Sequence, residues 1–409
     1  MPEHKVRRLR QVAWVVLAVC ALAVLGRIAT SPDRWFWDFE TYYHAAQVWA
    51  EGGNPYDLDE LARHSDGRVT HRFLYPLAAM PLLRTFSLLP FETARIAWLA
   101  LKLLLLVALV RLWRVSLLRD VDPLLIGFVL VLGFDAALIW ELESGNITII
   151  EQVLLWGGLT CFLRRRYALF VTLIVAAALI KLTLIAFLGL LIFAPGNRRG
   201  RIVTGAVALI IFAALAVGPF LARPDLSQTF AENLSELREI HPLNPSALAI
   251  IDHVGGSLLG PLASTPDRRL ALWALYAVAL VAVSWRTLRR VIAGGDQTLL
   301  MAVAVILYCL LAPRLKIYSY VMLMPASLLL WLRVLRGVDV GVLFAALVCA
   351  PGIRHLPGQL GTVAGYSSYL VNLALWLTIV YATWDDDRTG WLTATATPRE
   401  GACGGTPRS

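Results

Sequence analysis

Long apolar stretches alternate with short polar connections along almost the whole chain. A helix needs about 20 apolar residues to cross the hydrocarbon core of a bilayer, so the pattern predicts about twelve membrane-spanning helices within a membrane domain over residues 11–383. The predicted spans are 11–29, 94–112, 123–140, 147–163, 167–180, 182–194, 202–221, 270–288, 298–312, 319–333, 338–351 and 366–383. The sequence therefore predicts an all-α, polytopic integral membrane protein.

The two stretches on either side of Lys181 fit this pattern least well. Each has only 13 or 14 residues, which is short for a membrane crossing. Residues 167–194 can therefore form two crossings, one long helix or a re-entrant hairpin with Lys181 at its apex. The alternation of basic connections favours the hairpin.

Arginine and lysine gather in every second connection between the predicted spans. The clusters are Lys5–Arg10, Arg111–Arg119, Arg164–Arg166, Arg198–Arg201, Arg286–Arg290 and Arg333–Arg336. The positive-inside rule then places residues 1–10 in the cytoplasm, together with the tail 384–409. The tail is rich in Thr, Gly and Pro and is predicted to be disordered. The long connections 30–93 and 222–269 are expected on the outer side.

Composition agrees with a membrane protein. A hydrophobic content of 58% excludes an ordinary soluble globule. The net charge of +9 follows from clusters that set topology and can contact anionic lipids, so no nucleic-acid partner is predicted. The five cysteines have no metal-binding or disulfide spacing, and we expect neither a cofactor nor a protein-bound metal. One carboxylate with water and phosphate could still hold Mg²⁺.

The first outer connection carries carboxylates, aromatic residues and a tight polar turn directly after a membrane helix. Its two segments are Asp38-Phe39-Glu40-Thr41-Tyr42-Tyr43-His44-Ala45-Ala46 and Gly53-Asn54-Pro55-Tyr56-Asp57. Asp38 and Tyr42 are four residues apart and would share one face of a helix. Such a segment is where an active site would be built. Equally, Asp38 can be an N-cap at the membrane surface.

Residues 72–90, later in this connection, are apolar but interrupted by Pro76, Pro81 and Pro90. This pattern predicts a re-entrant or interfacial helix beside the site, because prolines interrupt the backbone hydrogen bonding that a crossing needs.

Ionisable residues inside predicted spans cost about 2.5–3.5 kcal/mol each and need a partner or a cavity. The residues concerned are Lys102, Asp135, Glu151 and Lys181. We expect Lys102 and Asp135 to form internal ion pairs that hold helices together. Lys181, at the apex of the proposed hairpin, is suited to the phosphate of a lipid head group.

The second outer connection has apolar residues at spacings of three and four, which predicts an amphipathic helix at the membrane interface. These residues are Leu226, Phe230, Leu234, Leu237 and Ile240. The polar turn that follows contains His241 and Asn244. His241 can act as a catalyst, although a single loop histidine more often binds neighbouring groups or lies at the surface.

Arg314 and Lys316 follow the ninth predicted span and would lie on the outer side, against the positive-inside pattern. A phosphate ligand would explain them through charge-assisted hydrogen bonds. Snorkelling of the long side chains to the interface explains either residue equally well.

Together these motifs resemble glycosyltransferase family 87, the polyprenol-phosphate-mannose-dependent mannosyltransferases of the GT-C fold. The matching features are Asp38-x-x-x-Tyr42-Tyr43-x-Ala45-Ala46, Gly53-Asn54-Pro55-Tyr56-Asp57, Tyr75-Pro76, Gly145-Asn146, Lys181 and Asn244-x-Ser246. They occur in order over roughly residues 10–385, nearly the whole chain. The family's usual Gly-Gln-x-Asn turn reads Gly145-Asn146-Ile147-Thr148 here.

The resemblance implies a hexosyltransferase in the bacterial plasma membrane, with helices in the extracytoplasmic loops and its active site on that side. Asp38 would be the catalytic base toward an acceptor hydroxyl, in an inverting single displacement. The leaving phosphate of a polyprenyl-phosphate sugar would be bound by Lys181, Arg314 and Lys316. The acceptor would be an envelope glycolipid or glycan. Substrate-binding residues would be Glu40, Tyr42, Tyr43, Asn54, Tyr56, Asp57, His241 and Asn244.

Two other functions compete with this one. A lipid-linked sugar polymerase or ligase usually carries its large outer loop late in the chain, whereas the rich loop comes first here. A transporter or flippase would be expected to show two related halves with broken spans, and the sequence has no such repeat.

Overall fold

The computed structural model describes residues 3–30, 35–236, 244–258, 260, 265–334 and 365–384. Within these ranges every regular element is a helix and no strand occurs. The helices are α1 (Glu3–Thr30), α2 (Trp37–Ala50), α3 (Leu58–His64), α4 (Met80–Ser87), α5 (Phe91–Ser116), α6 (Pro123–Ser144), α7 (Thr148–Leu163), α8 (Tyr167–Ile180), α9 (Arg198–Ala222), α10 (Pro224–Glu236), α11 (Ala247–Leu258), α12 (Pro266–Ala293), α13 (Gln297–Leu311), α14 (Leu323–Val334) and α17 (Ser367–Trp384). Three 3₁₀ segments accompany them: η2 (Leu77–Ala79), η3 (Leu182–Ile192) and η5 (Ile317–Met322).

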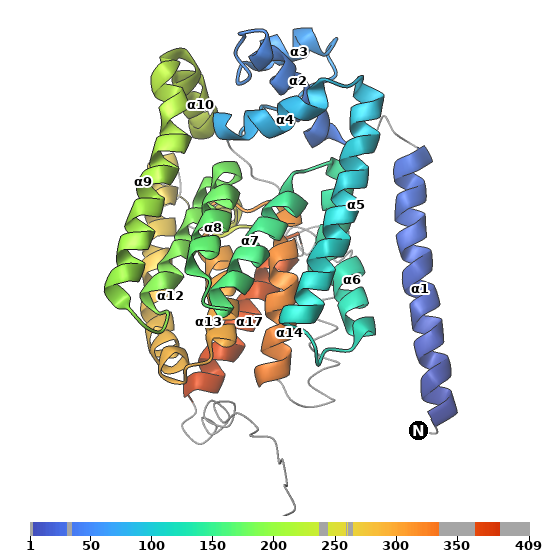
Figure 1. The fold of residues 1–409 in the computed structure, drawn as a ribbon, viewed down its shortest axis with the longest axis vertical. Helices are drawn as coiled ribbons and strands as arrows, with labels where there is room; N and C mark the ends of the chain where they lie inside the picture. The colour runs from blue at the N-terminus through green and yellow to red at the C-terminus, as the bar shows by residue number, and fades with distance from the viewer. Residues whose placement is uncertain are drawn as a thin grey trace, which may run out of the picture.

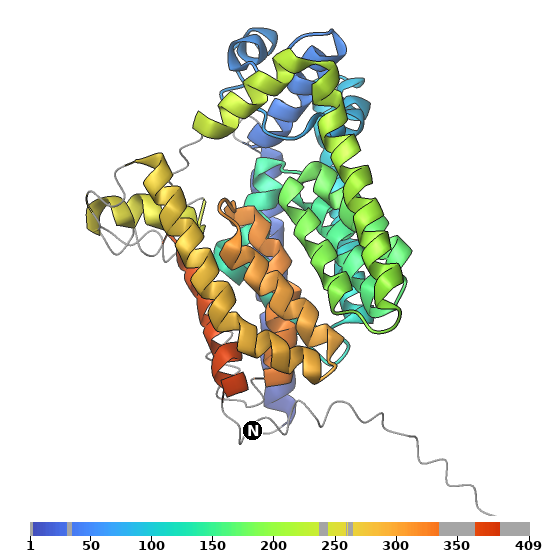
Figure 2. The ribbon, with the colours of Figure 1, turned by 90° about the vertical axis from the view of Figure 1, so that its left-hand side faces the viewer.

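The long helices stand side by side in a bundle, and short helices lie across one end of it (Figures 1 and 2). This crosswise layer consists of α2, α3, α4 and α10, at the end opposite the N-terminus. α1 stands at the edge of the bundle and packs on α6 (Figure 1). Ion pairs of 3.1 Å join the two helices at both ends, from Arg10 to Asp122 and from Arg27 to Glu143.

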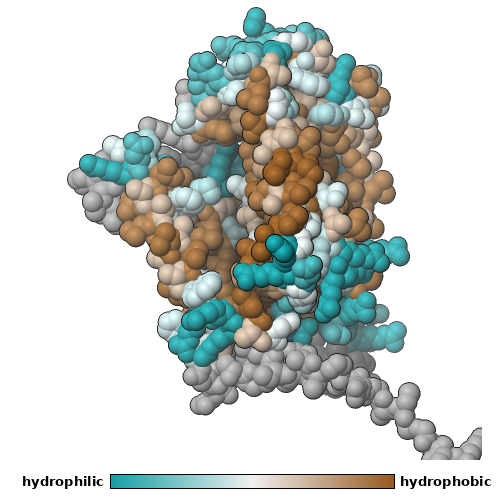
Figure 3. Space-filling model, turned by 60° about the vertical axis from the view of Figure 1, so that its left-hand side comes forward, coloured by the Kyte–Doolittle hydropathy of each residue, from teal (hydrophilic) through white to brown (hydrophobic). Residues whose placement is uncertain are grey.

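Five helices in the described part of the chain are long and apolar enough to cross a membrane: α1, α5, α6, α9 and α12. Their outward faces are hydrophobic; Ile210 of α9 and Val278 of α12, for example, are 69% and 68% exposed. On the face shown in Figure 3, polar residues gather toward the ends and a hydrophobic zone lies between them. This distribution suits lipid around the middle of the bundle and water at its ends.

The predicted spans that fall within the described residues coincide with helices, and their boundaries differ by at most eight residues. Shorter apolar helices occupy the remaining predicted positions, at α7, α8, η3, α13, η5 with α14, and α17. The span predicted at 338–351 lies outside the described residues. The prediction of an all-helical membrane protein is confirmed. It rested on the length of the apolar stretches, which matches the thickness of a bilayer.

The basic connections gather at one end of the bundle, the end that holds the N-terminus (Figure 1). Besides the pair of Arg10 with Asp122, Arg164 after α7 donates to Ser116 at the end of α5 over 3.2 Å. Asp296 before α13 pairs with Arg333 of α14 at 3.8 Å. The alternation read from the sequence therefore corresponds to a physical separation of basic connections from the crosswise layer.

The segment around Lys181 folds back on itself. The hydroxyl of Tyr167, at the start of α8, donates to the carbonyl of Pro195, just after η3, over 3.4 Å. The two limbs are therefore antiparallel, and one long helix is excluded. With 14 α-helical and 11 3₁₀ residues, the limbs are about 21 and 22 Å long. Both are shorter than the hydrocarbon core of about 30 Å, and Lys181 lies at their apex.

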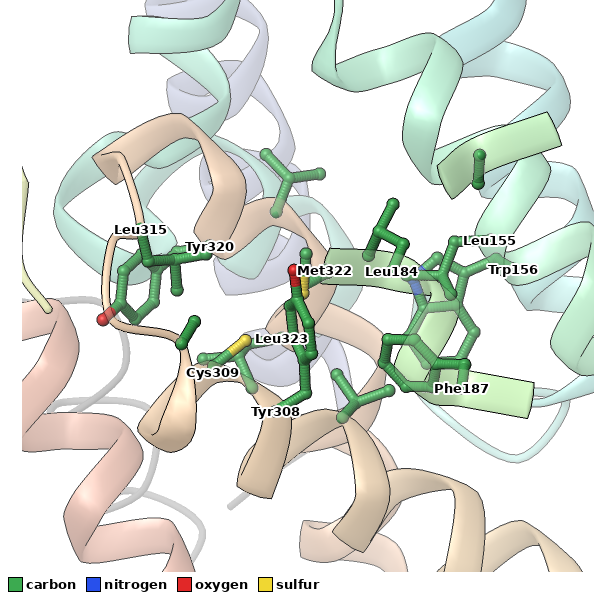
Figure 4. Packing of buried hydrophobic residues seen from close by; sticks show 14 of the residues in the cluster. Leu155, Trp156, Leu184, Phe187, Tyr308, Cys309, Leu315, Tyr320, Met322 and Leu323 are labelled. Atoms are coloured by element: carbon green, nitrogen blue, oxygen red, sulfur yellow. The ribbon is translucent and has the colours of Figure 1, made fainter. Parts of the chain in front are cut away.

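The core that supports this apex lies where η3, α7 and α13 meet (Figure 4). Leu184 and Phe187 of η3 face Leu155 and Trp156 of α7, and the ring of Tyr308 packs on Phe187 at 5.1 Å between centroids. All of these side chains are buried, which fixes the position of η3 and hence of the lysine that precedes it.

Two predictions for the crosswise layer are refined by the structure. The proline-interrupted stretch 72–90 forms η2 and α4, and α4 packs against α2 in the crosswise layer, in agreement with the prediction that this stretch does not cross. Part of the predicted amphipathic helix exists as α10, in which Leu226 is buried, but Leu234 is 45% exposed and Asn233 is buried in its place. Leu237 and Ile240 of the predicted stripe lie outside the described residues. The buried face of α10 is therefore rotated from the predicted apolar stripe, because Asn233 hydrogen bonds to the carbonyl of Tyr56 at 2.7 Å.

Candidate active site

Asp38 lies inside the first turn of α2, not at its cap. The cap residue is Phe36, whose φ of 67° places it in the left-handed region, and no side chain caps the helix. The backbone N–H of Phe36 donates to the carbonyl of Glu143 at 2.7 Å. The alternative interpretation of Asp38 as an N-cap is therefore wrong: its side chain is available for another partner, and the start of α2 is fixed to the end of α6.

The partner of Asp38 is Asn146, in the turn between α6 and α7. Nδ2 of Asn146 lies 2.8 Å from Oδ2 of Asp38, 2.8 Å from the hydroxyl of Tyr42 and 3.2 Å from the hydroxyl of Tyr75. Tyr42 also donates to Tyr75 at 2.9 Å. Oδ1 of Asn146 accepts from the hydroxyl of Thr148 at 2.8 Å, which orients the amide. Three segments far apart in sequence thus meet at one buried carboxamide: α2, the stretch that contains Tyr75, and the turn between α6 and α7.

Asn146 is a site residue that the sequence reasoning missed, since it entered only as part of the Gly145-Asn146 turn. The turn requires glycine: Gly145 has a φ of 70°, and a Cβ there would lie 2.7 Å from Cδ1 of Phe36. The indole N–H of Trp98 donates to the carbonyl of Gly145 at 2.8 Å. This tight fit against α2 and α5 places the Asn146 amide next to the Asp38 carboxylate.

A buried ion pair between α5 and α6 stabilises the turn between α6 and α7. Nζ of Lys102, on α5, lies 2.8 Å from Oε2 of Glu141 on α6, and neither side chain is exposed. Oε1 of Glu141 accepts from the backbone N–H of Ile149 in the first turn of α7, at 3.1 Å. The internal ion pair predicted for Lys102 is confirmed, with Glu141 as its partner. Asp135 lies in a left-handed kink of α6, and its internal ion pair stays a prediction.

Burial governs the proton affinity of this cluster. It raises the pKa of the Asp38 carboxyl above its usual range, although the Asn146 hydrogen bond and the charges of Lys316 and His71 oppose that rise. Burial also raises the pKa of Tyr42 and Tyr75, so both phenols remain protonated at neutral pH. A carboxylate that accepts from a neutral amide in a partly buried site is chemically suited to accept a proton.

The other predicted residues of α2 point elsewhere. Glu40 forms an ion pair of 3.4 Å with Arg68. The hydroxyl of Tyr43 donates to the carbonyl of Leu89, after α4, at 2.8 Å. The structure therefore brings Tyr42 to Asp38 and uses Tyr43 to attach α2 to α4.

The predicted turn Asn54-Pro55-Tyr56-Asp57 is confirmed as a turn, and its side chains hold the crosswise layer together. Asn54 accepts from the N–H of Tyr56 at 3.0 Å and donates to Thr229 of α10 at 3.0 Å. Tyr56 is fully buried, and its hydroxyl donates to the carbonyl of Tyr75 at 2.9 Å. Asp57 caps the start of α3. These contacts position Tyr75 and α10 around the site.

Lys181 contacts η5 and interacts with two charged side chains. Its Nζ donates to Oγ of Ser319 in η5 at 2.8 Å, and its charge interacts with those of Glu151 and Arg314. The charge of Lys316 interacts with that of Asp38. Arg314 is therefore near enough to Lys181, and Lys316 near enough to Asp38, for their charges to interact.

Asn244 anchors the loop that carries these cations. Its Oδ1 accepts from the backbone N–H of Leu315 at 3.1 Å, and Ser246 donates to the carbonyl of Pro313 at 2.8 Å. The Asn244-x-Ser246 motif thus fixes the backbone on both sides of Arg314. His241 lies outside the described residues. Within the ranges that the structure covers, no three His, Cys, Asp or Glu side chains are grouped so as to hold a metal ion.

Comparison with known proteins identifies the family. The model of glycosyltransferase family 87 matches residues 73–313, more than half of the chain. The chain belongs to glycosyltransferase family 87. A relative from Mycobacterium tuberculosis (strain ATCC 25618 / H37Rv), a polyprenol-phosphate-mannose-dependent alpha-(1-2)-phosphatidylinositol mannoside mannosyltransferase, is 26% identical over 375 residues, 87% of this chain and 85% of the relative. No solved structure matches the chain.

The resemblance inferred from the sequence motifs is thus confirmed, and the protein is a glycosyltransferase with several potential membrane-spanning helices. The segment matched to family 87 contains Tyr75, Asn146 and Lys181 and begins after Asp38. Membership of family 87 favours the enzyme over the transporter or flippase considered from the sequence.

Proposed function

We propose that this family 87 protein transfers a sugar, most simply mannose, from a polyprenyl-phosphate donor to an envelope glycolipid or glycan. The family and the mycobacterial relative support this proposal, since that relative depends on polyprenol-phosphate-mannose and acts on a phosphatidylinositol mannoside. A membrane enzyme suits such substrates because both donor and acceptor are anchored in the bilayer.

The proposed architecture is a GT-C type fold with about twelve spans, its N-terminus in the cytoplasm and its site on the extracytoplasmic side of a bacterial plasma membrane. The separation of the basic connections from the crosswise layer supports this orientation (Figure 1). Asp38 then lies at the outer side, where a lipid-linked sugar would enter from the membrane.

In the proposed reaction, Asp38 is the general base. Its carboxylate takes the proton from an acceptor hydroxyl while that oxygen forms a bond to the anomeric carbon. The bond between the anomeric carbon and the phosphate oxygen breaks, and polyprenyl phosphate leaves with the electron pair. A single displacement of this kind inverts the anomeric centre. Asn146 holds the base in place, and the Tyr42 hydroxyl accepts from the same amide nitrogen.

The leaving phosphate needs positive charge more than it needs a proton donor, because a phosphomonoester is a stable anion. In our proposal Lys181, Arg314 and Lys316 supply it. Lys181 immediately precedes η3 and Lys316 immediately precedes η5. The N–H groups at the starts of these two segments would add partial positive charge on the same region.

The observation that carries the proposal is the hydrogen bond of 2.8 Å from Asn146 to Asp38, at a site that the charge of Lys316 also reaches. It is tested with membranes containing the protein, a radiolabelled polyprenyl-phosphate mannose and a crude envelope-lipid acceptor. We expect transfer by wild type and a loss of about 10²-fold or more with Asp38→Asn.

A matched control is Asp225→Asn, which removes an exposed carboxylate of α10 that pairs only locally with Arg223 at 2.8 Å. This variant should transfer label at the wild-type rate. Equal transfer by wild type and Asp38→Asn would contradict the role of Asp38 as base. No transfer by wild type from mannosyl or arabinosyl donors would contradict the proposed function itself.

A further inference from the structure

Glu151 is a buried carboxylate that the mechanism above does not use. It lies in the first turn of α7 and is 2% exposed. Its Oε2 has no hydrogen-bond partner among the residues that the structure describes. A buried acceptor left without a donor costs free energy, so native proteins rarely keep one unless water or a ligand completes it.

Its position is next to the reacting groups. Leu155, one turn further along α7, faces Leu184 of η3 (Figure 4), and the N–H of Leu184 donates to the carbonyl of Lys181 at 2.9 Å. Glu151 is therefore at the level of the lysine, and the two charges interact. Its charge also interacts with Tyr75, which shares the Asn146 amide with Asp38. Glu151 is thus near enough to both Lys181 and Tyr75 for its charge to act on each of them.

We propose that Glu151 binds the sugar ring of the donor by accepting hydrogen bonds from its hydroxyl groups. The inference rests on the proposed function. An in-line displacement requires the attacking oxygen with its base on one side of the anomeric carbon and the leaving phosphate on the other, so the sugar ring occupies the space between. A carboxylate accepts from two neighbouring hydroxyls and makes stronger hydrogen bonds than a neutral group.

A second role for Glu151 would give a different result on substitution. If Glu151 served only as the counter-charge of Lys181, its neutralisation would remove repulsion toward any phosphate bound there. Binding of the donor and of sugar-free polyprenyl phosphate would then strengthen together. If Glu151 binds the sugar, only the mannosylated lipid loses affinity.

The experiment measures binding of polyprenyl-phosphate mannose and of sugar-free polyprenyl phosphate to purified protein in detergent, for wild type and Glu151→Gln. We expect the affinity for the mannosylated donor to fall about 10- to 100-fold, as for loss of a hydrogen bond to a charged group. Affinity for the sugar-free lipid should be unchanged or higher. Thr160→Val is the control, because Thr160 is buried on the same helix with an unpartnered Oγ1, about 13 Å further along.

Thr160→Val should bind both lipids as wild type does. Parallel changes in both affinities with Glu151→Gln, in either direction, would overturn the inference, as would an unchanged affinity for the donor. Wild-type protein that binds neither lipid would overturn the proposed function itself. The two failures are therefore distinguishable, and neither readout depends on the identity of the acceptor.

Discussion

Asn146 donates a hydrogen bond of 2.8 Å to Asp38 across 108 positions of sequence. This one contact joins the turn between α6 and α7 to the first turn of α2, and so joins the bundle to the crosswise layer. The orientation of the carboxylate is therefore set by the end of α6 and the start of α7 in the bundle, and not by α2 alone.

Replacing Asn146 by Ala should move the acid limb of the pH–rate profile upward. A base works only when deprotonated, so transfer falls as pH drops through its pKa, which burial places above the usual value of about 3.9 in Asp38. The Asn146 hydrogen bond stabilises the carboxylate and lowers that pKa. Its loss raises the pKa further, and the half-maximal point of kcat/KM should shift to higher pH.

Asn233→Ala provides the comparison for that profile. Asn233 is buried and donates to the carbonyl of Tyr56 at 2.7 Å, within the crosswise layer. Its removal should lower stability without displacing the acid limb. An acid limb that stays in place with Asn146→Ala would contradict the assignment of this limb to Asp38.

Replacing Lys102 by Met should destabilise the protein by about 3–5 kcal/mol, because it leaves the Glu141 carboxylate buried without its partner. Glu141→Gln added to Lys102→Met should restore much of this loss, since a neutral amide is cheaper to bury and still accepts from Ile149 N–H. Thermal unfolding in detergent measures both. A double variant no more stable than the single one would show that Lys102 acts through packing and not through charge.

Gly145→Ala should lower both stability and transfer. The new Cβ would lie 2.7 Å from Phe36 and 2.9 Å from Phe39 at a φ of 70°, so we expect a loss of about 2–4 kcal/mol from overpacking and backbone strain together. Gly52→Ala separates the two terms, because Gly52 has a φ of 88° but open space around it. Equal losses in the two variants would mean that the fit against α2 is unimportant.

His44 should make the crosswise layer sensitive to acid. Burial, aided by the charges of Arg68 and His64, lowers the pKa of His44 to about 4, while an unfolded histidine titrates near its ordinary value of about 6.5. Between these values the unfolded chain binds the extra proton, so stability falls as pH drops from about 6.5 to about 4, by about 3 kcal/mol in total. Melting temperatures across this window should fall less steeply for His44→Gln than for wild type; parallel slopes would contradict the prediction.

Much of the bundle could be predicted because its signals are local. An apolar stretch long enough to cross a bilayer forms a helix. A lysine inside such a stretch needs a partner, which for Lys102 is Glu141. The fold-back at Lys181 followed from counting basic connections. The turn at Asn54-Pro55 followed from its residue types.

The contacts of the site could not be predicted in the same way. Asn146 and Asp38 meet only because α6 ends against the start of α2, a relation that no local pattern contains. Tyr56 is an aromatic residue with a hydroxyl, a type that often binds ligands, yet packing against Phe230 of α10 buries it completely. Whether a polar or aromatic residue faces a substrate or a neighbouring helix depends on how the helices pack, which the sequence leaves open.

The amide of Asn146 has two hydrogens, and three oxygens lie within reach of its nitrogen. One of the three oxygens must therefore lack an amide hydrogen or share one with another oxygen. When Asp38 is a carboxylate, it accepts one of the amide hydrogens, and the hydroxyls of Tyr42 and Tyr75 share the other. If Asp38 takes up the acceptor's proton, as we propose, it becomes a weaker hydrogen-bond acceptor, and the amide would donate one hydrogen to each phenol. The two amide hydrogens would therefore orient the carboxylate before the proposed proton transfer and satisfy both phenols after it.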